Sequence, residues 1–249
     1  MAFDEWMLNA VAGTPGELIA RLYTWQVGTI TFGCNQRCET ALDHSAVGDT
    51  PVIRRVTGGR AVFHDLSEIT YAIAFNTGTP PCPALAGSTG KTSEVIALML
   101  SQFLARLGVA VDWVKASASE NSRTDYFHKA ACFASHARYE LASGPSKIVA
   151  SARRDWGGAA LQHGSIKFWG VASHAALNMD GVGRQGTSKS VEIEELKRMA
   201  AVFGATLGDH VGMEPDEIRL SLKERQLIDA RTKLVERMPL DKRDLIAQS

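Results

Sequence analysis

The stretch RRVTGGRAVFHD, residues 54–65, places two adjacent glycines between two short runs of strand-forming residues. Adjacent glycines let the backbone turn sharply and leave main-chain N–H groups open to a ligand. Arg54, Arg55 and Arg60 surround the turn, and a guanidinium can hold anionic or carbonyl groups with several donors at once. The same residues also fit a simple tight turn with solvated arginines, so the spacing alone supports both interpretations about equally.

Strand and helix signals extend to both sides of this turn. Residues 21–33 look like two short strands around a Val-Gly turn, and the nearly continuous apolar run 69–75 predicts a central strand. Residues 76–92 are rich in Pro, Gly and Thr and are long enough to form a lid or an active-site wall. The remaining signals, in chain order, are a helix over 94–107, a strand over 109–114 and a hairpin over 139–154.

The C-terminal segment, about 188–249, is charged, amphipathic and helical in pattern. Strands followed by segregated helices predict an α+β fold, with a mixed β-sheet domain, flanking helices and a helical C-terminal segment. A chain of 249 residues can bury one sizeable core. We therefore expect a single domain over 1–249, whose motif-bearing core spans about 1–170.

Composition narrows the function classes. Lys and Arg number 27 and Asp and Glu number 27, a balance that argues against broad nucleic-acid or anionic-membrane binding. The sequence contains no apolar stretch that could cross a bilayer, and its start lacks the pattern of an export signal. Four cysteines in a chain of this length do not form a disulfide framework, so free thiols and a cytoplasmic location are expected.

Two residues near the predicted hairpin are candidates for covalent chemistry. Cys132 follows two alanines just before the hairpin, and Lys147 opens its second strand. A lysine close to a thiol favours the thiolate and can stabilise a developing oxyanion. Taken singly, each residue is more often structural, because free cysteines are usually buried and lysines beside turns are usually solvated. A Cys132–His136 or Cys132–His163 dyad also remains open.

Taken together, these stretches resemble the catalytic domain of the biotin and lipoate protein ligases. Within that group the chain is most similar to the cysteine/lysine octanoyltransferases of lipoate biosynthesis. RRVTGGRAVFHD followed by EITYAI resembles the family's acyl-binding signature. ACFASHARYEL, SKIVASARR and GGAALQHGSI resemble its loop cysteine, its lysine hairpin and its closing strand. The order and spacing match over about residues 3–170.

The resemblance implies an acyltransferase mechanism. Cys132 would take an octanoyl group from acyl carrier protein as a thioester, and Lys147 would stabilise the thiolate and the oxyanions. The acceptor would be a lysine on a lipoyl domain, of the glycine-cleavage H protein or of a dehydrogenase E2. No cofactor and no metal are implied. The implied substrate-binding residues are Arg55, Thr57, Gly58, Gly59, Arg60, Ala61, Val62, His64, Ser151, His163 and Gly164.

Two alternatives share these motifs. A lipoate–protein ligase would activate a free acid with ATP and magnesium, and an inactive relative would only bind acyl groups or lipoyl domains. Four departures from the family pattern bear on the choice: Ala150 replaces a glycine, Arg153 replaces a glutamine, Gly-Pro-Ser replaces the usual Gly-Arg before the lysine, and the HDLSEITY segment is one residue longer. Docking of acidic carriers further predicts local positive charge, for which Arg54, Lys147, Arg153 and Arg154 are the candidates.

Overall fold

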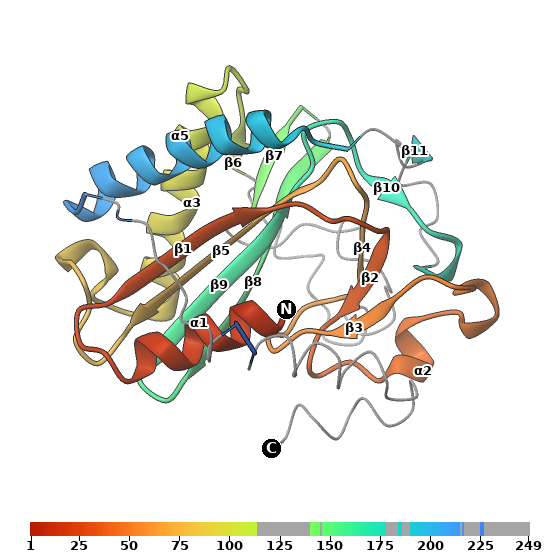
Figure 1. Ribbon diagram of the computed structural model, residues 1–249, viewed down its shortest axis with the longest axis horizontal. Helices are drawn as coiled ribbons and strands as arrows, with labels where there is room; N and C mark the ends of the chain where they lie inside the picture. Colours follow the sequence, from red (N-terminus) through yellow and green to blue (C-terminus); the bar gives the residue numbers. More distant parts are fainter. Residues whose placement is uncertain are drawn as a thin grey trace.

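The computed structural model describes residues 1–113, 140–144, 146–177, 184–185, 190–214, 216 and 225–226. Two β-sheets and the helices that cover the larger one make up its core (Figure 1). A third, two-stranded sheet pairs β10 (Ala172–Ser173) with β11 (Arg184–Gln185) in parallel. Among the described residues, no helix is long and apolar enough to cross a membrane.

The large sheet has six strands in the order β1-β5-β9-β8-β7-β6, with every neighbouring pair antiparallel. Strand β5 lies inside this sheet, second from its edge, between β1 and β9, and it is buried at every residue. The predicted strand over 69–75 is therefore confirmed, as one that is paired on both sides and covered on both faces. The strand bounds are β1 Leu18–Tyr23, β5 Ile69–Asn76, β6 Asp112–Trp113, β7 Leu141–Ser143, β8 Ser146–Trp156 and β9 Ala159–Ile166.

The small sheet has the order β3-β2-β4, with β2 (Thr29–Phe32) parallel to β3 (Val52–Arg54) and antiparallel to β4 (Val62–His64). The turn of residues 55–61 thus joins the two outer strands of this sheet. Its apolar residues form a core of their own, in which Ile30, Phe32 and Ala61 are fully buried. The short helix α2 (Cys38–Ala41) packs on the same core.

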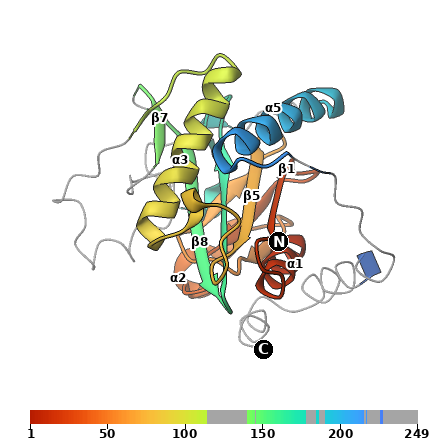
Figure 2. The same ribbon diagram turned by 90° about the vertical axis from the view of Figure 1, so that its left-hand side faces the viewer.

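Three long helices cover the large sheet on its two faces (Figure 2). Helices α3 (Thr89–Arg106) and α5 (Ile193–Val211) bury Phe103 and Phe203 together against one face. Helix α1 (Ala2–Ala12) packs Met7 and Val11 against the other face. Three 3-10 turns complete the described elements: His44–Ala46, Pro83–Leu85 and Ala175–Leu177.

Several predicted elements are confirmed, and two differ. Residues 21–33 do contain two strands, but β1 pairs in the large sheet and β2 in the small one, so they are not a hairpin. The segment 76–92 ends as the first turn of α3, capped by Ser88, and none of it lines the pocket described below. The predicted hairpin is present as β7 and β8, with Gly144 at φ 56° in its turn.

Candidate active site

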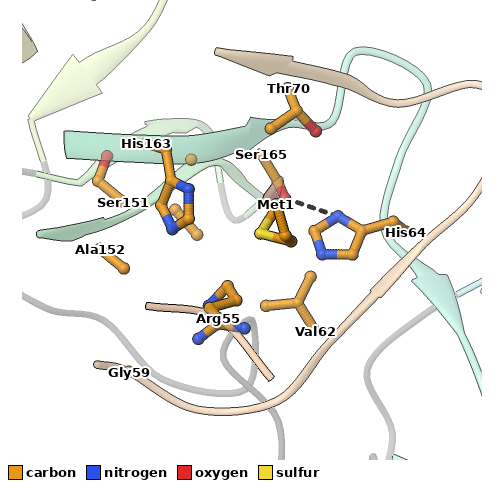
Figure 3. A pocket seen from close by; sticks show the side chains of 12 residues that line it. Met1, Arg55, Gly59, Val62, His64, Thr70, Ser151, Ala152, His163 and Ser165 are labelled. Atoms are coloured by element: carbon orange, nitrogen blue, oxygen red, sulfur yellow. Dashed lines mark hydrogen bonds between the residues drawn. The ribbon is translucent and has the colours of Figure 1, made fainter. Parts of the chain in front are cut away.

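A pocket lies between the two main sheets, on the face of the large sheet that α1 also covers. It encloses about 380 Å³ of space, including its open mouth. Strands β8 and β9 form one wall, and the turn of residues 55–61 with β4 forms the opposite wall (Figure 3). Its lining residues are Met1, Arg55, Gly59, Val62, His64, Thr70, Ala150, Ser151, Ala152, His163, Gly164 and Ser165.

The turn at residues 55–61 is held together from inside by the Arg55 guanidinium. Its Nη1 donates to the backbone oxygen of Thr31 at 3.0 Å and to its hydroxyl at 2.8 Å. Its Nη2 donates to the carbonyls of Gly58 at 3.0 Å and Arg60 at 2.9 Å. Arg55 is only 5% exposed, and its guanidinium donates these four hydrogen bonds within the protein. Its main role is therefore to stabilise the turn and not to bind a ligand.

Only the second glycine of the pair is required by the backbone. Gly59 has φ +92°, a conformation that L side chains rarely adopt, and a Cβ there would lie 3.2 Å from the Arg55 Nη2. A Cβ on Gly58 would meet only the Asn35 side chain, at 3.9 Å. Both glycines were expected to allow the sharp turn, but only position 59 requires a glycine.

His163 is fixed by hydrogen bonds on both ring nitrogens. Nδ1 lies 3.0 Å from Asp4 Oδ2, and Nε2 lies 2.6 Å from the Thr57 hydroxyl. Asp4 is fully buried in α1 and is also paired with Arg21 at 2.6 Å. Both ring nitrogens of His163 thus have partners within the fold, and because Cys132 lies outside the described residues, a Cys132–His163 dyad stays a prediction.

His64 is held in the same way on the other side of the pocket (Figure 3). Its Nδ1 lies 2.7 Å from Glu68 Oε1 and 3.3 Å from the Ser165 hydroxyl, and its Nε2 lies 2.7 Å from the Thr31 hydroxyl. The Trp25 indole stacks on the ring at 4.2 Å between centroids. Each pocket histidine thus contacts a buried carboxylate with one nitrogen and a threonine with the other.

These networks make the pocket wall apolar although many of its residues are polar. The hydrogen-bonding atoms of Arg55, His64 and His163 turn toward protein partners, and mainly carbon faces the cavity. Burial lowers the pKa of both His64 and His163 below the usual value of 6.5, against the nearby carboxylates that raise it. Both imidazoles are therefore neutral at physiological pH, and the pocket suits an apolar ligand better than an anionic one.

Lys147 reaches the pocket side of the sheet through a β-bulge in β8. Leu141 pairs with Val149 and Ala142 with Lys147, so Ile148 is an extra residue in the ladder. Both Ile148 and Val149 belong to the core on the α3 side. Two successive residues, Ile148 and Val149, therefore face the same side of the sheet. Lys147 before them and Ala150 after them face the opposite side, and Ala150 lines the pocket.

The ammonium of Lys147 is buried and paired with a carboxylate. Its Nζ lies 2.6 Å from Glu140 Oε1, and the two side chains are 3% and 5% exposed. Lysines beside turns are usually solvated, but Lys147 is buried in the fold. Cys132, the partner predicted for Lys147, lies outside the described residues, as does His136.

The other predicted substrate-binding residues divide into two groups. The pocket is lined by seven of them, Arg55, Gly59, Val62, His64, Ser151, His163 and Gly164. The remaining four, Thr57, Gly58, Arg60 and Ala61, lie behind this lining. Thr57 and the carbonyls of Gly58 and Arg60 hold the turn as described, and Ala61 is packed in the small-sheet core. Ser151 turns its hydroxyl to Tyr71 at 2.7 Å, away from the cavity.

Sequence reasoning missed the groups that hold the histidines, namely Asp4, Arg21, Thr31, Glu68 and Lys167. One signal was available for the first of them. Asp4 is at helical spacing from Met7, Leu8 and Val11, the buried apolar face of α1, and a buried acidic residue requires a partner. The alternation of β8 could likewise have found Ala152 in the lining, two positions from Ala150.

The four cations predicted to dock acidic carriers all have intramolecular partners. Arg54 Nη1 donates to the carbonyls of Cys34 and Gln36, and Arg154 Nη1 to that of Val56. Arg153 and Lys147 are paired with carboxylates. Each of these side chains thus has a role in the fold, and docking on them stays a prediction.

Comparison with known proteins identifies the relatives of this chain. The family model of the lipoyl protein ligase A/B catalytic domain matches residues 1–200. A protein named octanoyltransferase LipM from Moorella thermoacetica is 36% identical over 170 residues, 67% of this chain and 59% of the relative. A protein of the same name from Carboxydothermus hydrogenoformans is 30% identical over 247 residues, 91% of this chain and 87% of the relative. This chain spans only about 60% of the length of the first curated relatives that it matches.

Solved structures share the fold at low sequence identity. An archaeal bipartite lipoate protein ligase from Thermoplasma acidophilum superposes with a TM-score of 0.67 at 16% identity, over 98% of this chain and 90% of that one. Lipoate-protein ligase A bound with ATP gives 0.64 at 16% identity, over 93% and 87%. The α+β fold expected from the sequence, with its mixed strands and flanking helices, is confirmed. The match of the family model and the identity to curated relatives show that this chain belongs to the lipoyl protein ligase A/B catalytic domain family.

Proposed function

We propose that this chain is an octanoyltransferase of lipoate biosynthesis, which moves a medium-chain acyl group from acyl carrier protein to the lysine of a lipoyl domain. The observation that carries the proposal is an apolar pocket with a buried lysine on the same face of the sheet. The relatives named octanoyltransferase support the same reaction class. An acyl chain needs the apolar walls, and thioester exchange needs a cation near its carbonyl.

In the proposed reaction the Cys132 thiolate attacks the thioester carbonyl of the donor. The oxyanion of the tetrahedral intermediate is stabilised by the Lys147 ammonium, and the carrier leaves as its thiolate. The acyl chain packs against Val62, Ala150 and Ala152. A neutral lysine amine of the lipoyl domain then attacks the acyl-enzyme. The Cys132 thiolate is released, the attacking amine gives up one proton to that thiolate or to solvent, and an amide forms without ATP.

The pocket wall gives a quantitative expectation for chain length. A butyryl donor lacks four of the methylene groups of octanoyl, and each buried methylene contributes about 0.8 kcal/mol. The sum is about 3 kcal/mol, which corresponds to a loss of about a hundredfold in kcat/KM. Equal rates for butyryl and octanoyl donors would contradict an apolar chain site.

The direct test mixes the protein with octanoyl-acyl carrier protein in the absence of ATP. Intact mass should reveal one octanoyl adduct that hydroxylamine removes, and adding a lipoyl domain should transfer it to that domain. Cys132→Ser should abolish the adduct, whereas the control Cys82→Ser, at a partly buried cysteine on the α3 side of the sheet, should not. Labelling that requires ATP, magnesium and free octanoate would favour the ligase, and binding without labelling would favour an inactive relative.

Lys147 needs a test that separates chemistry from folding. Removing one partner of a buried ion pair costs about 3–5 kcal/mol, because the other charge is left buried and alone. Lys147→Met is therefore combined with Glu140→Gln, which leaves both positions neutral and similar in size. The double variant should fold and lose acyl transfer by at least about a hundredfold. Glu140→Gln alone keeps the lysine at a cost in stability, and it serves as the activity control at a temperature where circular dichroism shows it to be folded.

A further inference from the structure

Glu68 lies at the centre of a closed set of hydrogen bonds behind the pocket. Its Oε1 accepts from the Thr70 hydroxyl at 2.7 Å and lies 2.7 Å from His64 Nδ1. Its Oε2 accepts a short hydrogen bond from Lys167 Nζ, which also donates to the carbonyl of Phe63 at 2.9 Å. The carboxylate and the ammonium are both almost completely buried. Neither residue lines the pocket, but both act on a residue that does.

The donors around His64 determine which of its nitrogens carries the hydrogen. Arg55 Nη1 donates to the Thr31 hydroxyl, so the hydrogen of that hydroxyl is available for His64 Nε2. Nε2 is then an acceptor, and the ring hydrogen lies on Nδ1. From there it is donated to Glu68, which as a carboxylate can only accept. The ring is neutral and all its hydrogen bonds are satisfied in this one arrangement.

The charges that face the ring are balanced toward the neutral form. Glu68 alone would favour an imidazolium, since an opposite charge at hydrogen-bond distance stabilises the charged form. Lys167 neutralises that carboxylate, and the Arg55 guanidinium adds a second positive charge behind Thr31. Burial acts in the same direction and, with the two cations, lowers the pKa of His64. On the other sides the ring faces the uncharged Trp25 and Ser165.

We propose that Glu68 and Lys167 are positioning residues, which together hold the His64 ring uncharged with its hydrogen on Nδ1. The consequence is that a histidine can stand in the wall of the pocket without placing a charge beside the ligand. Lys167 is the decisive partner, because the carboxylate without it would draw a proton onto the ring. This inference concerns the state of the protein itself, and only its effect on substrate rests on the proposed function.

The test reads the ring directly by nitrogen-15 NMR of protein labelled in its histidines, with the His64 signals assigned by their loss in His64→Gln. The unmodified protein should show a neutral ring with hydrogen on Nδ1 at about pH 7. Lys167→Met should raise the pKa of His64 by about one to two pH units, so that on acidification the imidazolium forms at a higher pH than in the unmodified protein. Glu68→Gln combined with Lys167→Met should restore the neutral ring. Lys91→Met, at an exposed position of α3, should leave it unchanged.

Several results would overturn the inference. A hydrogen on Nε2 or an imidazolium in the unmodified protein would refute the assignment. An unchanged His64 in folded Lys167→Met would refute the role of the lysine. Should that single variant fail to fold, the neutral double variant decides, because an imidazolium there would show that charge balance does not set the state of the ring.

The effect on substrate is measured separately. In Lys167→Met, KM for octanoyl-acyl carrier protein should rise about tenfold at about pH 6.5 while kcat changes less than about twofold, and the double variant should recover. An unchanged KM in a protein whose ring has become charged would refute the apolar-wall consequence. Absence of transfer by the unmodified protein, with the NMR result as expected, would refute the proposed function and leave the assignment of His64 standing.

Discussion

Replacing Gly164 with alanine should separate the two strands that form the main wall of the pocket. A Cβ at this position would lie 2.3 Å from the carbonyl oxygen of Ala150 and 2.8 Å from Tyr71 Cε1. Both distances are shorter than any ordinary carbon contact, and the first involves backbone, which cannot move without disturbing the β8–β9 ladder. Inserting one methyl group into a closed core costs about 1–3 kcal/mol, and the backbone clash places this variant at the upper end.

Urea unfolding at about 25 °C measures the effect as a difference in unfolding free energy. A loss of about 3 kcal/mol corresponds to a fall of about 6 °C or more in Tm for a chain of this size. Gly13→Ala is the matched control, because Gly13 ends α1 in a right-handed conformation and its Cβ would have 4.0 Å of clearance. The control should be neutral or slightly stabilising. A Gly164→Ala protein as stable as the control would refute the argument that these strands are in closest contact there.

Three further changes test the pocket. Thr57→Val should cost about 1–3 kcal/mol in urea unfolding, because His163 Nε2 loses its buried partner, and Thr57→Ser should restore most of it; equal losses would show that the hydroxyl is not what matters. The lowered pKa of His163 means that the unfolded state binds a proton more readily, so the unfolding free energy should fall as the pH drops below about 6.5, and His163→Gln should fall less steeply. Ala150→Val should reduce octanoyl transfer and spare shorter donors, because its larger side chain faces Val62 across the pocket; a uniform loss for all chain lengths would argue against a steric effect.

The sequence predicted the elements of the fold correctly where the local pattern of apolar and turn residues was strong. The nearly continuous apolar run of β5 predicted a strand inside the sheet, because only a strand covered on both faces can bury every side chain. The β7–β8 hairpin followed from its Gly-Pro-Ser turn. Strands β1 and β2 were identified as strands but not assigned to their sheets, since pairing depends on partners that are far away in sequence.

The site was predictable only in its lining. The glycine turn with β4 and the β9 stretch carried motifs, and seven predicted residues from these segments and β8 line the pocket. The groups that support the histidines come from α1, β1, β2, the segment before β5 and the segment after β9, and no local pattern connects Asp4 with residue 163. Hydrogen-bond partners of this kind are set by three-dimensional packing, which spacing along the chain does not encode.

The extra residue in β8 has a consequence for any comparison of this strand between proteins. If residues 147–150 alternated regularly without the bulge, the ammonium at position 147 would lie on the same side as Val149, beneath α3, instead of beside the cavity. The position of the Lys147 ammonium therefore depends on the β-bulge in β8 and not only on the presence of a lysine at this position. A relative that keeps three positions between its lysine and the pocket-lining residue but lacks the bulge would carry the lysine on the α3 side of the sheet.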